Sequence, residues 1–112
     1  MRYSGELQYD DGDIFIFEAF IIHEIEKAIG FNAITTWNLG QRWKIDSTAF
    51  FNGEQYETQG AYSVQLMNDK DETPCQVVFT FVKETDVGVE VSGYWDEAER
   101  QYQFKGTLVP KD

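Results

Sequence analysis

Apolar and polar residues alternate with a period of two along most of this chain. Such alternation is typical of β-strands that bury one face and expose the other. Short polar or glycine-containing stretches separate the alternating segments and favour turns. We therefore predict eight strands, over residues 3–9, 14–22, 31–39, 43–51, 55–66, 77–81, 87–95 and 102–108.

Two dipeptides predict how the strands pair. Asp11-Gly12 and Asn52-Gly53 favour two-residue hairpins, because these residues tolerate the positive φ of a type I′ turn. In a hairpin, the turn length determines which residues face each other. The predicted pairs are Leu7–Ile16, Gly5–Glu18, Ala49–Tyr56 and Trp43–Tyr62.

The remaining connections are less regular. A three-residue turn at 40–42 would pair Trp37 with Ile45, and residues 68–74 form a predicted polar loop. An acidic turn near residue 98 would set an aromatic residue over a glycine, an arrangement that shields a sharply bent strand. The pairs expected there are Trp95–Tyr102 and Gly93–Phe104, and the inner row expected in the sixth strand is Val77, Phe79 and Phe81.

Residues 23–29 are the one candidate helix. They contain good helix formers, the isoleucines at 22, 25 and 29 lie near a 3.6-residue period, and Gly30 suits a helix end. A continued strand is the alternative. The fold class that we predict is an all-β antiparallel up-and-down barrel of about eight strands, with this one possible short helix.

Closure of the last strand onto the first is favoured, because edge strands would otherwise stay unpaired. The whole chain, residues 1–112, is long enough for one such domain and too short for two. Its meander and its glycine–aromatic segments, such as Gly93-Tyr94-Trp95 and 102–106, resemble calycin-type barrels of the lipocalin and avidin class. The resemblance is one of pattern along the chain, implies a small β-barrel and carries over no site residue.

Composition narrows the function classes. The formal net charge is -11, from 20 acidic and 9 basic residues. Nucleic acids and anionic membranes are themselves negative, so direct binding to either is disfavoured. The N-terminus lacks the apolar stretch of a signal peptide, and the run at 14–22 is too short to span a bilayer. We therefore expect a cytoplasmic protein.

Candidate chemistry is sparse. Cys75 is the single cysteine, so no internal disulfide can form, and its apolar neighbours favour a buried thiol. His23 is the single histidine and cannot build a multi-histidine zinc site. The acidic stretch 10–13 lacks the terminal glutamate of a calcium loop, since residue 21 is isoleucine. We expect no catalytic residue, no metal and no cofactor, and an enzyme is the least supported class.

Aromatic residues are the best functional clue. The chain has 9 Phe, 6 Tyr and 3 Trp, and binding cavities are mostly apolar and aromatic. Trp and Tyr have polar tips that a dry core does not need. The first hypothesis is therefore a non-enzymatic barrel that holds a small apolar or amphipathic ligand. Its predicted ligand-binding residues are Trp37, Trp43, Tyr56, Tyr62, Trp95 and Tyr102, with Glu18 as a polar anchor.

Two other partners remain open. The acidity also suits a protein-binding module, of inhibitor or immunity type, that docks on a basic protein. The strand at 14–22 is apolar on both faces, so Phe15, Phe17 and Ile21 form a possible homodimer surface. A packed aromatic core without a ligand is the structural alternative to all of these.

Overall fold

The computed structural model is an all-β chain. It describes the backbone of residues 2–9, 14–23, 28–36, 42–65, 68–97 and 100–110, and side chains over 3–8, 28–34, 42–65, 72–96 and 101–110. The strands are β1 (Arg2–Tyr9), β2 (Ile14–His23), β3 (Ala28–Thr36), β4 (Arg42–Phe51), β5 (Tyr56–Thr58), β6 (Ala61–Gln65), β7 (Asn68–Glu84), β8 (Val89–Glu97) and β9 (Arg100–Pro110). Every pair of neighbouring strands is antiparallel.

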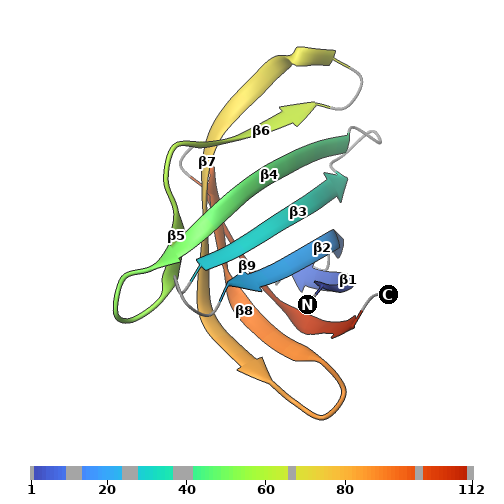
Figure 1. Cartoon of the computed structure of the whole chain (residues 1–112). Coiled ribbons are helices and arrows are strands. Elements are labelled where there is room, and N and C mark those ends of the chain that lie inside the picture. The colour runs from blue at the N-terminus through green and yellow to red at the C-terminus, as the bar shows by residue number, and fades with distance from the viewer. Residues whose placement is uncertain are drawn as a thin grey trace.

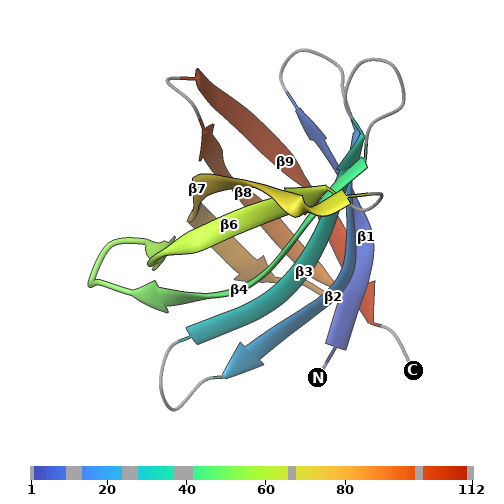
Figure 2. The ribbon, with the colours of Figure 1, turned by 90° about the horizontal axis from the view of Figure 1, so that it is seen from above.

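The strands follow one another in chain order around a common centre (Figure 1, Figure 2). β5 and β6 share one position, because both lie between β4 and β7. β9 pairs with β1, so each of the eight positions has two hydrogen-bonded neighbours. The predicted eight-stranded antiparallel meander is confirmed.

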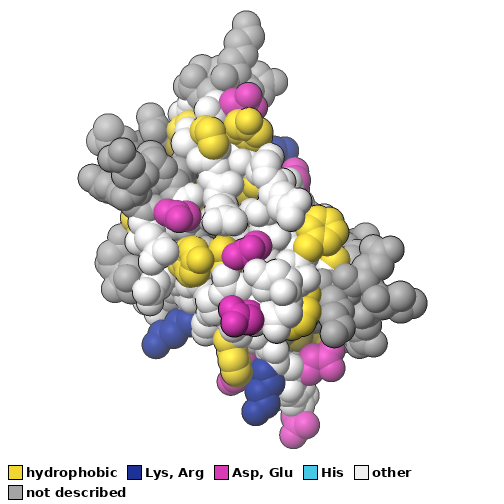
Figure 3. All heavy atoms as spheres, turned by 90° about the vertical axis from the view of Figure 1, so that its left-hand side faces the viewer, with side chains coloured by type: hydrophobic (Ala, Val, Ile, Leu, Met, Phe, Trp, Pro, Cys, Tyr) yellow, Lys and Arg dark blue, Asp and Glu magenta, His cyan; other side chains and the backbone are white. Residues whose placement is uncertain are grey.

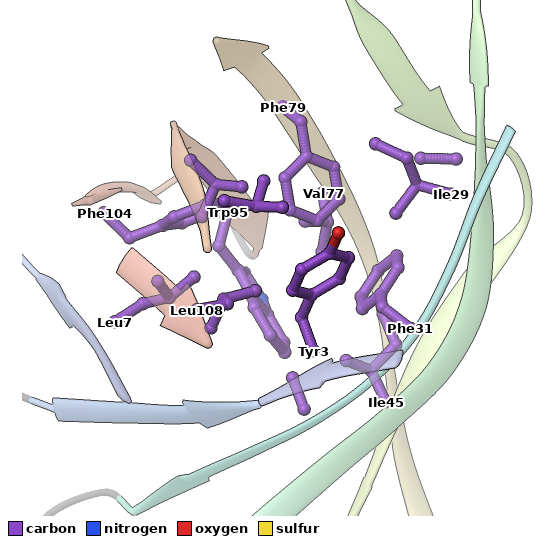
Figure 4. Packing of buried hydrophobic residues seen from close by; sticks show 14 of the residues in the cluster. Tyr3, Leu7, Ile29, Phe31, Ile45, Val77, Phe79, Trp95, Phe104 and Leu108 are labelled. Carbon is purple, nitrogen blue, oxygen red and sulfur yellow. The ribbon is translucent and has the colours of Figure 1, made fainter. Parts of the chain in front are cut away.

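Aromatic and aliphatic side chains fill the centre (Figure 4). The rings of Phe31 on β3 and Phe79 on β7 meet edge to face at 5.2 Å between centroids, although β4 and β5–β6 separate their strands around the ring. Phe79 also contacts Phe104 on β9 at 5.7 Å. These two contacts join three walls of the barrel at mid-height.

The β8–β9 hairpin has the predicted register. Trp95 pairs with Tyr102 and Gly93 pairs with Phe104. A Cβ atom at Gly93 would lie 1.9 Å from the carbonyl oxygen of Val78 on β7, so glycine is required for the two strands to approach. The predicted pairing of an aromatic residue with this glycine is confirmed, and the close approach of β7 is an additional reason for the glycine.

The predicted β1–β2 register is wrong in the half of the hairpin near the turn. The two-residue turn at 11–12 also predicts Tyr3 opposite Phe20, and this pair is present, but Gly5 pairs with Phe17 and Leu7 with Phe15. The register slips by one residue between these pairs, and a second irregularity lies between Phe17 and Ala19 in the β2–β3 pairing. An irregularity of this kind inserts one residue and reverses the alternation beyond it. Glu18 therefore does not pair with Gly5.

The turn after β4 is longer than two residues. The Asn52 side chain accepts hydrogen bonds from the backbone N–H groups of Glu54 and Gln55 at 3.0 and 3.1 Å, and Ala49 pairs with Thr58. The predicted partner of Ala49 is Tyr56, so the register differs by two residues. A shift of two residues leaves each β5 side chain on the predicted face. Beyond it, Gly60 has a φ of 64°, a conformation that favours glycine.

The insertion at Gly60 reverses the faces of β6. Ala61 and Ser63 are buried there, whereas Tyr62 is 49% exposed. The predicted inward position of Tyr62, and its pairing with Trp43, are therefore wrong. Trp43 pairs with Gln65 instead.

β7 departs from the prediction at both ends. Residues 68–74, expected as a loop, form its first part, and residues 72–74 pair with β6. A register shift between Phe79 and Phe81 turns Phe81 outward, where it is 46% exposed, and Val82 packs against the core instead. Within the described residues, β8 does not extend along the first part of β7. Pro74, which has no N–H, limits further pairing at that edge.

Two further predictions concern chain connections. His23 ends β2 and Ala28 and Ile29 begin β3, so the helix over 23–29 is wrong at these positions, and residues 24–27 lie outside the described part. Cross-strand packing decides here over helix propensity, because Ile29 is fully buried beside Ala49. Ile45 pairs with Ala33 rather than with Trp37, which lies outside the described residues.

The interruption between β5 and β6 is bridged by a side chain. Thr58 is buried, and its hydroxyl accepts a hydrogen bond from the backbone N–H of Val77 at 3.0 Å. This bond satisfies a buried donor at the point where the β5–β7 pairing stops.

We expect Thr58→Val to destabilise the protein by about 1–3 kcal/mol, because it leaves the buried Val77 N–H without an acceptor. Urea unfolding would measure the change. The matched control is Thr80→Val, since the Thr80 hydroxyl is exposed and bonds the Ser92 carbonyl at 3.2 Å. Equal losses in the two variants would contradict this role of Thr58.

Candidate functional site

The two ends of the barrel differ in how their inward-facing residues are covered. One end, which we call the Tyr3 end, has Tyr3, Ile29, Val89 and Leu108 facing inward, and all four are buried. At the opposite end, which we call the Trp43 end, several inward-facing side chains are only half-buried. The Tyr3 end is therefore sealed by apolar packing, and the Trp43 end is the accessible one.

The Trp43 end combines aromatic and polar groups. Residues paired directly across antiparallel strands share a face, so the burial of Ser63 places its partner Thr73 inward as well. The same rule places Tyr102 inward beside fully buried Trp95. The half-buried inward residues at this end are Trp43, Gln65, Thr73, Cys75 and Tyr102.

Trp43 is a half-buried aromatic candidate at this end. Cys75 and Tyr102 pack against the buried cluster, whereas Trp43 is not part of that packing within the described residues. β4 and β9 lie on opposite sides of the eight-position ring, so Trp43 and Tyr102 come from opposite walls. A half-buried indole can stack on a ligand.

Small side chains line the wall below Trp43. Ala33, Ala61 and Ser63 are buried inward-facing residues of β3 and β6, and Ser47 of β4 is half-buried. Opposite them stand the large side chains of Trp95 and Phe104. Small residues on one wall opposite large residues on the other are a common arrangement inside small barrels.

Polar contacts at this end are few and local. The Ser63 hydroxyl donates to the Thr73 carbonyl oxygen at 3.5 Å, which is a long hydrogen bond. The Gln65 and Thr73 side chains lie at the rim, where a ligand could bond with them. Such an arrangement can bind and orient a small molecule.

The predicted site residues are divided by the fold. Trp43, Trp95 and Tyr102 come together at the Trp43 end, with Trp95 fully buried. Tyr56 faces inward but lies toward the Tyr3 end, where its ring contacts Phe51 at 5.1 Å. Tyr62 lies on the outer surface. Only part of the predicted aromatic set therefore shares one site.

Other predicted residues lie outside the described part. These are Trp37 and the side chains of Glu18, Phe15, Phe17 and Ile21.

Sequence reasoning missed several rim residues. Alternation counted from the Asn52-Gly53 turn predicts Ser63 and Gln65 on the outer face, and Thr73 falls in the predicted loop, because this count does not include the residue inserted at Gly60. Gly60 itself was the available signal, since an isolated glycine within a strand often marks a bulge. Tyr3 was placed correctly on the inner face, but no role followed from that position.

The outer surface carries its own features. Figure 3 shows acidic side chains between apolar ones on the face of β5, β6 and β7, with Lys and Arg near its margins. A hollow of about 340 Å³ lies on another outer face, lined by Gln8, Phe81, Glu90, Val91, Ser92, Lys105, Gly106 and Thr107. Most of its walls are exposed side chains, so a small ligand there would stay largely in water.

Metal and membrane sites find no support in the part of the chain that the structure describes. No group of three or more His, Cys, Asp or Glu side chains there could hold a metal ion. No helix there is long and apolar enough to cross a membrane.

Comparison of the chain with protein-family models, with curated proteins and with solved structures finds no match. The functional argument therefore rests on the geometry of the Trp43 end.

The difference between Trp43 and Trp95 can be measured by fluorescence. In a Trp37→Phe background, we expect Trp43→Phe to remove most of the acrylamide-quenchable emission, because Trp95 is fully buried. The emission that remains should lie at shorter wavelength and be quenched several-fold less. Strong quenching of Trp95 would contradict the packing of this end.

Proposed function

We propose that the protein binds a small apolar or amphipathic molecule at the Trp43 end of its barrel. The observation that carries the proposal is the half-buried indole of Trp43 at an inward-facing position, outside the packed core. Barrel mouths are preferred ligand sites.

The packed centre limits how large the ligand can be. The contacts from Phe31 through Phe79 to Phe104 occupy the middle of the barrel. A ligand therefore lies above these rings, against Trp43, Tyr102 and the small residues of β3 and β6. Gln65, Thr73 and Tyr102 supply polar groups that orient it.

The charge of the protein favours one class of ligand over another. With a net charge of -11, the protein repels anions at long range. Neutral and cationic amphiphiles are therefore favoured over fatty acids and phosphorylated compounds. The neutral dye Nile red is a suitable first probe.

We expect Trp43→Ala to weaken Nile red binding by about tenfold, in line with about 1.4 kcal/mol for an aromatic contact. Fluorescence titration would measure the dissociation constants. Tyr62→Ala is the matched control, because Tyr62 is an aromatic residue exposed on the outside of neighbouring β6.

Cys75 gives an independent readout. It is the single cysteine and lies half-buried at the Trp43 end, so bound Nile red should slow its alkylation by N-ethylmaleimide. An unchanged alkylation rate at saturating Nile red, together with equal affinities of the two alanine variants, would overturn the proposal.

A second candidate function follows from the outer face of β5–β8. Glu57, Glu72 and Asp96 lie there near exposed Tyr62, and Glu57 accepts a hydrogen bond from the Gln55 amide at 2.8 Å. Lys44, the nearby cation on β4, lies 4.0 Å from Asp46. This face suits a basic protein partner, whose charges would complement the carboxylates.

A hexa-arginine peptide would test that candidate. We expect the triple variant Glu57→Gln, Glu72→Gln, Asp96→Asn to bind the peptide at least fivefold more weakly than Glu6→Gln, Glu84→Gln, Glu90→Gln. Both variants lose the same charge, so the comparison separates a local surface from a general effect of net charge. Equal affinities, measured by calorimetry at low salt, would exclude the acidic face as a binding surface.

A further inference from the structure

Tyr3 brings a phenol into the interior of the barrel. It lies on β1, pairs with Phe20 and Pro110, and is 7% exposed. Figure 4 shows its ring pointing from β1 toward the middle of the buried cluster, with the oxygen directed toward Phe31 and Val77. The polar tip of Tyr3 is thus carried away from the surface and into apolar surroundings.

Within the described part of the chain, the Tyr3 hydroxyl has no hydrogen-bond partner. The two other buried polar side chains there do have partners, since Thr58 accepts from the Val77 N–H and Ser63 donates to the Thr73 carbonyl. Buried hydroxyl groups are normally hydrogen-bonded, because an unbonded one loses its interaction with water and gains nothing. The exception at Tyr3 therefore points to an occupant that supplies the missing partner.

A water molecule alone suits this place poorly. A buried water needs two to four polar partners of its own. Phe31 and Val77, toward which the Tyr3 oxygen points in Figure 4, offer no polar side-chain atom. A polar atom on an otherwise apolar molecule needs only the one partner that Tyr3 provides.

Resting on the function proposed above, we propose that the Tyr3 hydroxyl is the internal anchor for the ligand. The ligand class is a neutral amphiphile with one hydrogen-bond acceptor, such as a ketone or an ester, at its inner end. A charged inner end is disfavoured, because the buried polar residues of the described part are Thr58 and Ser63, and neither can neutralise a charge.

The distance from the opening is compatible with a short apolar chain. Val77, toward which the Tyr3 oxygen points, is the next inward-facing residue after Cys75 on β7. Two residues of strand span roughly 7 Å. A ten-carbon molecule that enters beside Trp43 is long enough to reach this depth.

The test uses two probes that differ only in the polar group, decane and 2-decanone. Their dissociation constants are measured by displacement of Nile red from the wild-type protein and from Tyr3→Phe. We expect Tyr3→Phe to weaken 2-decanone binding about fivefold to tenfold, as for the loss of one hydrogen bond, and to leave decane binding unchanged. Tyr3→Phe keeps the ring, so the core should stay packed and the melting temperature should not fall.

Tyr56→Phe is the matched control, because Tyr56 is an inward-facing, half-buried tyrosine that packs against the same cluster. It should change the affinity of neither probe.

If 2-decanone binds Tyr3→Phe as tightly as wild type, the anchor is overturned while the binding function stands. If neither probe displaces Nile red from the wild-type protein, the anchor is overturned. If Nile red itself does not bind the wild-type protein, the proposed function is overturned. A lower melting temperature of Tyr3→Phe with unchanged binding would identify a structural water at this hydroxyl and also overturn the anchor.

Discussion

The edge-to-face contact between Phe31 and Phe79 joins parts of the barrel that backbone pairing does not connect. Hydrogen bonds link each strand only to its neighbours, so they alone would leave the curvature of the sheet free to vary. The ring contact reaches across the interior from β3 to β7, and Phe104 extends it to β9. Aromatic pairs of this geometry contribute about 0.5–1.5 kcal/mol beyond the area they bury. These rings also limit the part of the barrel interior that a ligand could occupy.

The position of these rings gives the interior two unequal parts. Toward the Tyr3 end, branched aliphatic residues such as Val89 and Leu108 complete a buried apolar core. Toward the Trp43 end, alanine and serine replace large residues on one wall, and half-buried aromatic and polar groups surround the opening. The same alternation of side chains thus builds a stabilising core and a candidate site within one sheet. The phenol of Tyr3 points from the sealed end toward the middle of the barrel.

Sequence pattern predicts the architecture well and the site only partly. Alternation and turn residues determine the number, order and closure of the strands, and the β8–β9 register follows from them residue by residue. Errors arise where one inserted residue reverses a face, at β1–β2, at Gly60 and between Phe79 and Phe81. Each insertion costs little locally and is selected by packing across the barrel, so the local sequence carries little sign of it.

Those reversals explain why Tyr62 and Phe81, large apolar residues in strands, lie on the outer surface. They also explain why a serine and a threonine, rather than a tyrosine, face the opening. A method that counts alternation from the nearest turn cannot place residues beyond an insertion. Gly60 was the exception, because its left-handed backbone conformation leaves a visible residue preference.

The separation of the sealed end from the accessible end has a consequence for how this protein can change over evolutionary time. Half-buried rim positions such as Trp43 and Gln65 lie outside the packed cluster, so they can be replaced without unfolding the barrel. Residues around Tyr3, Val89 and Leu108 lack this freedom, because each change there disturbs the core directly. Related chains should therefore vary at one rim and keep the other nearly constant, and under the proposed function this variation would change the preferred ligand.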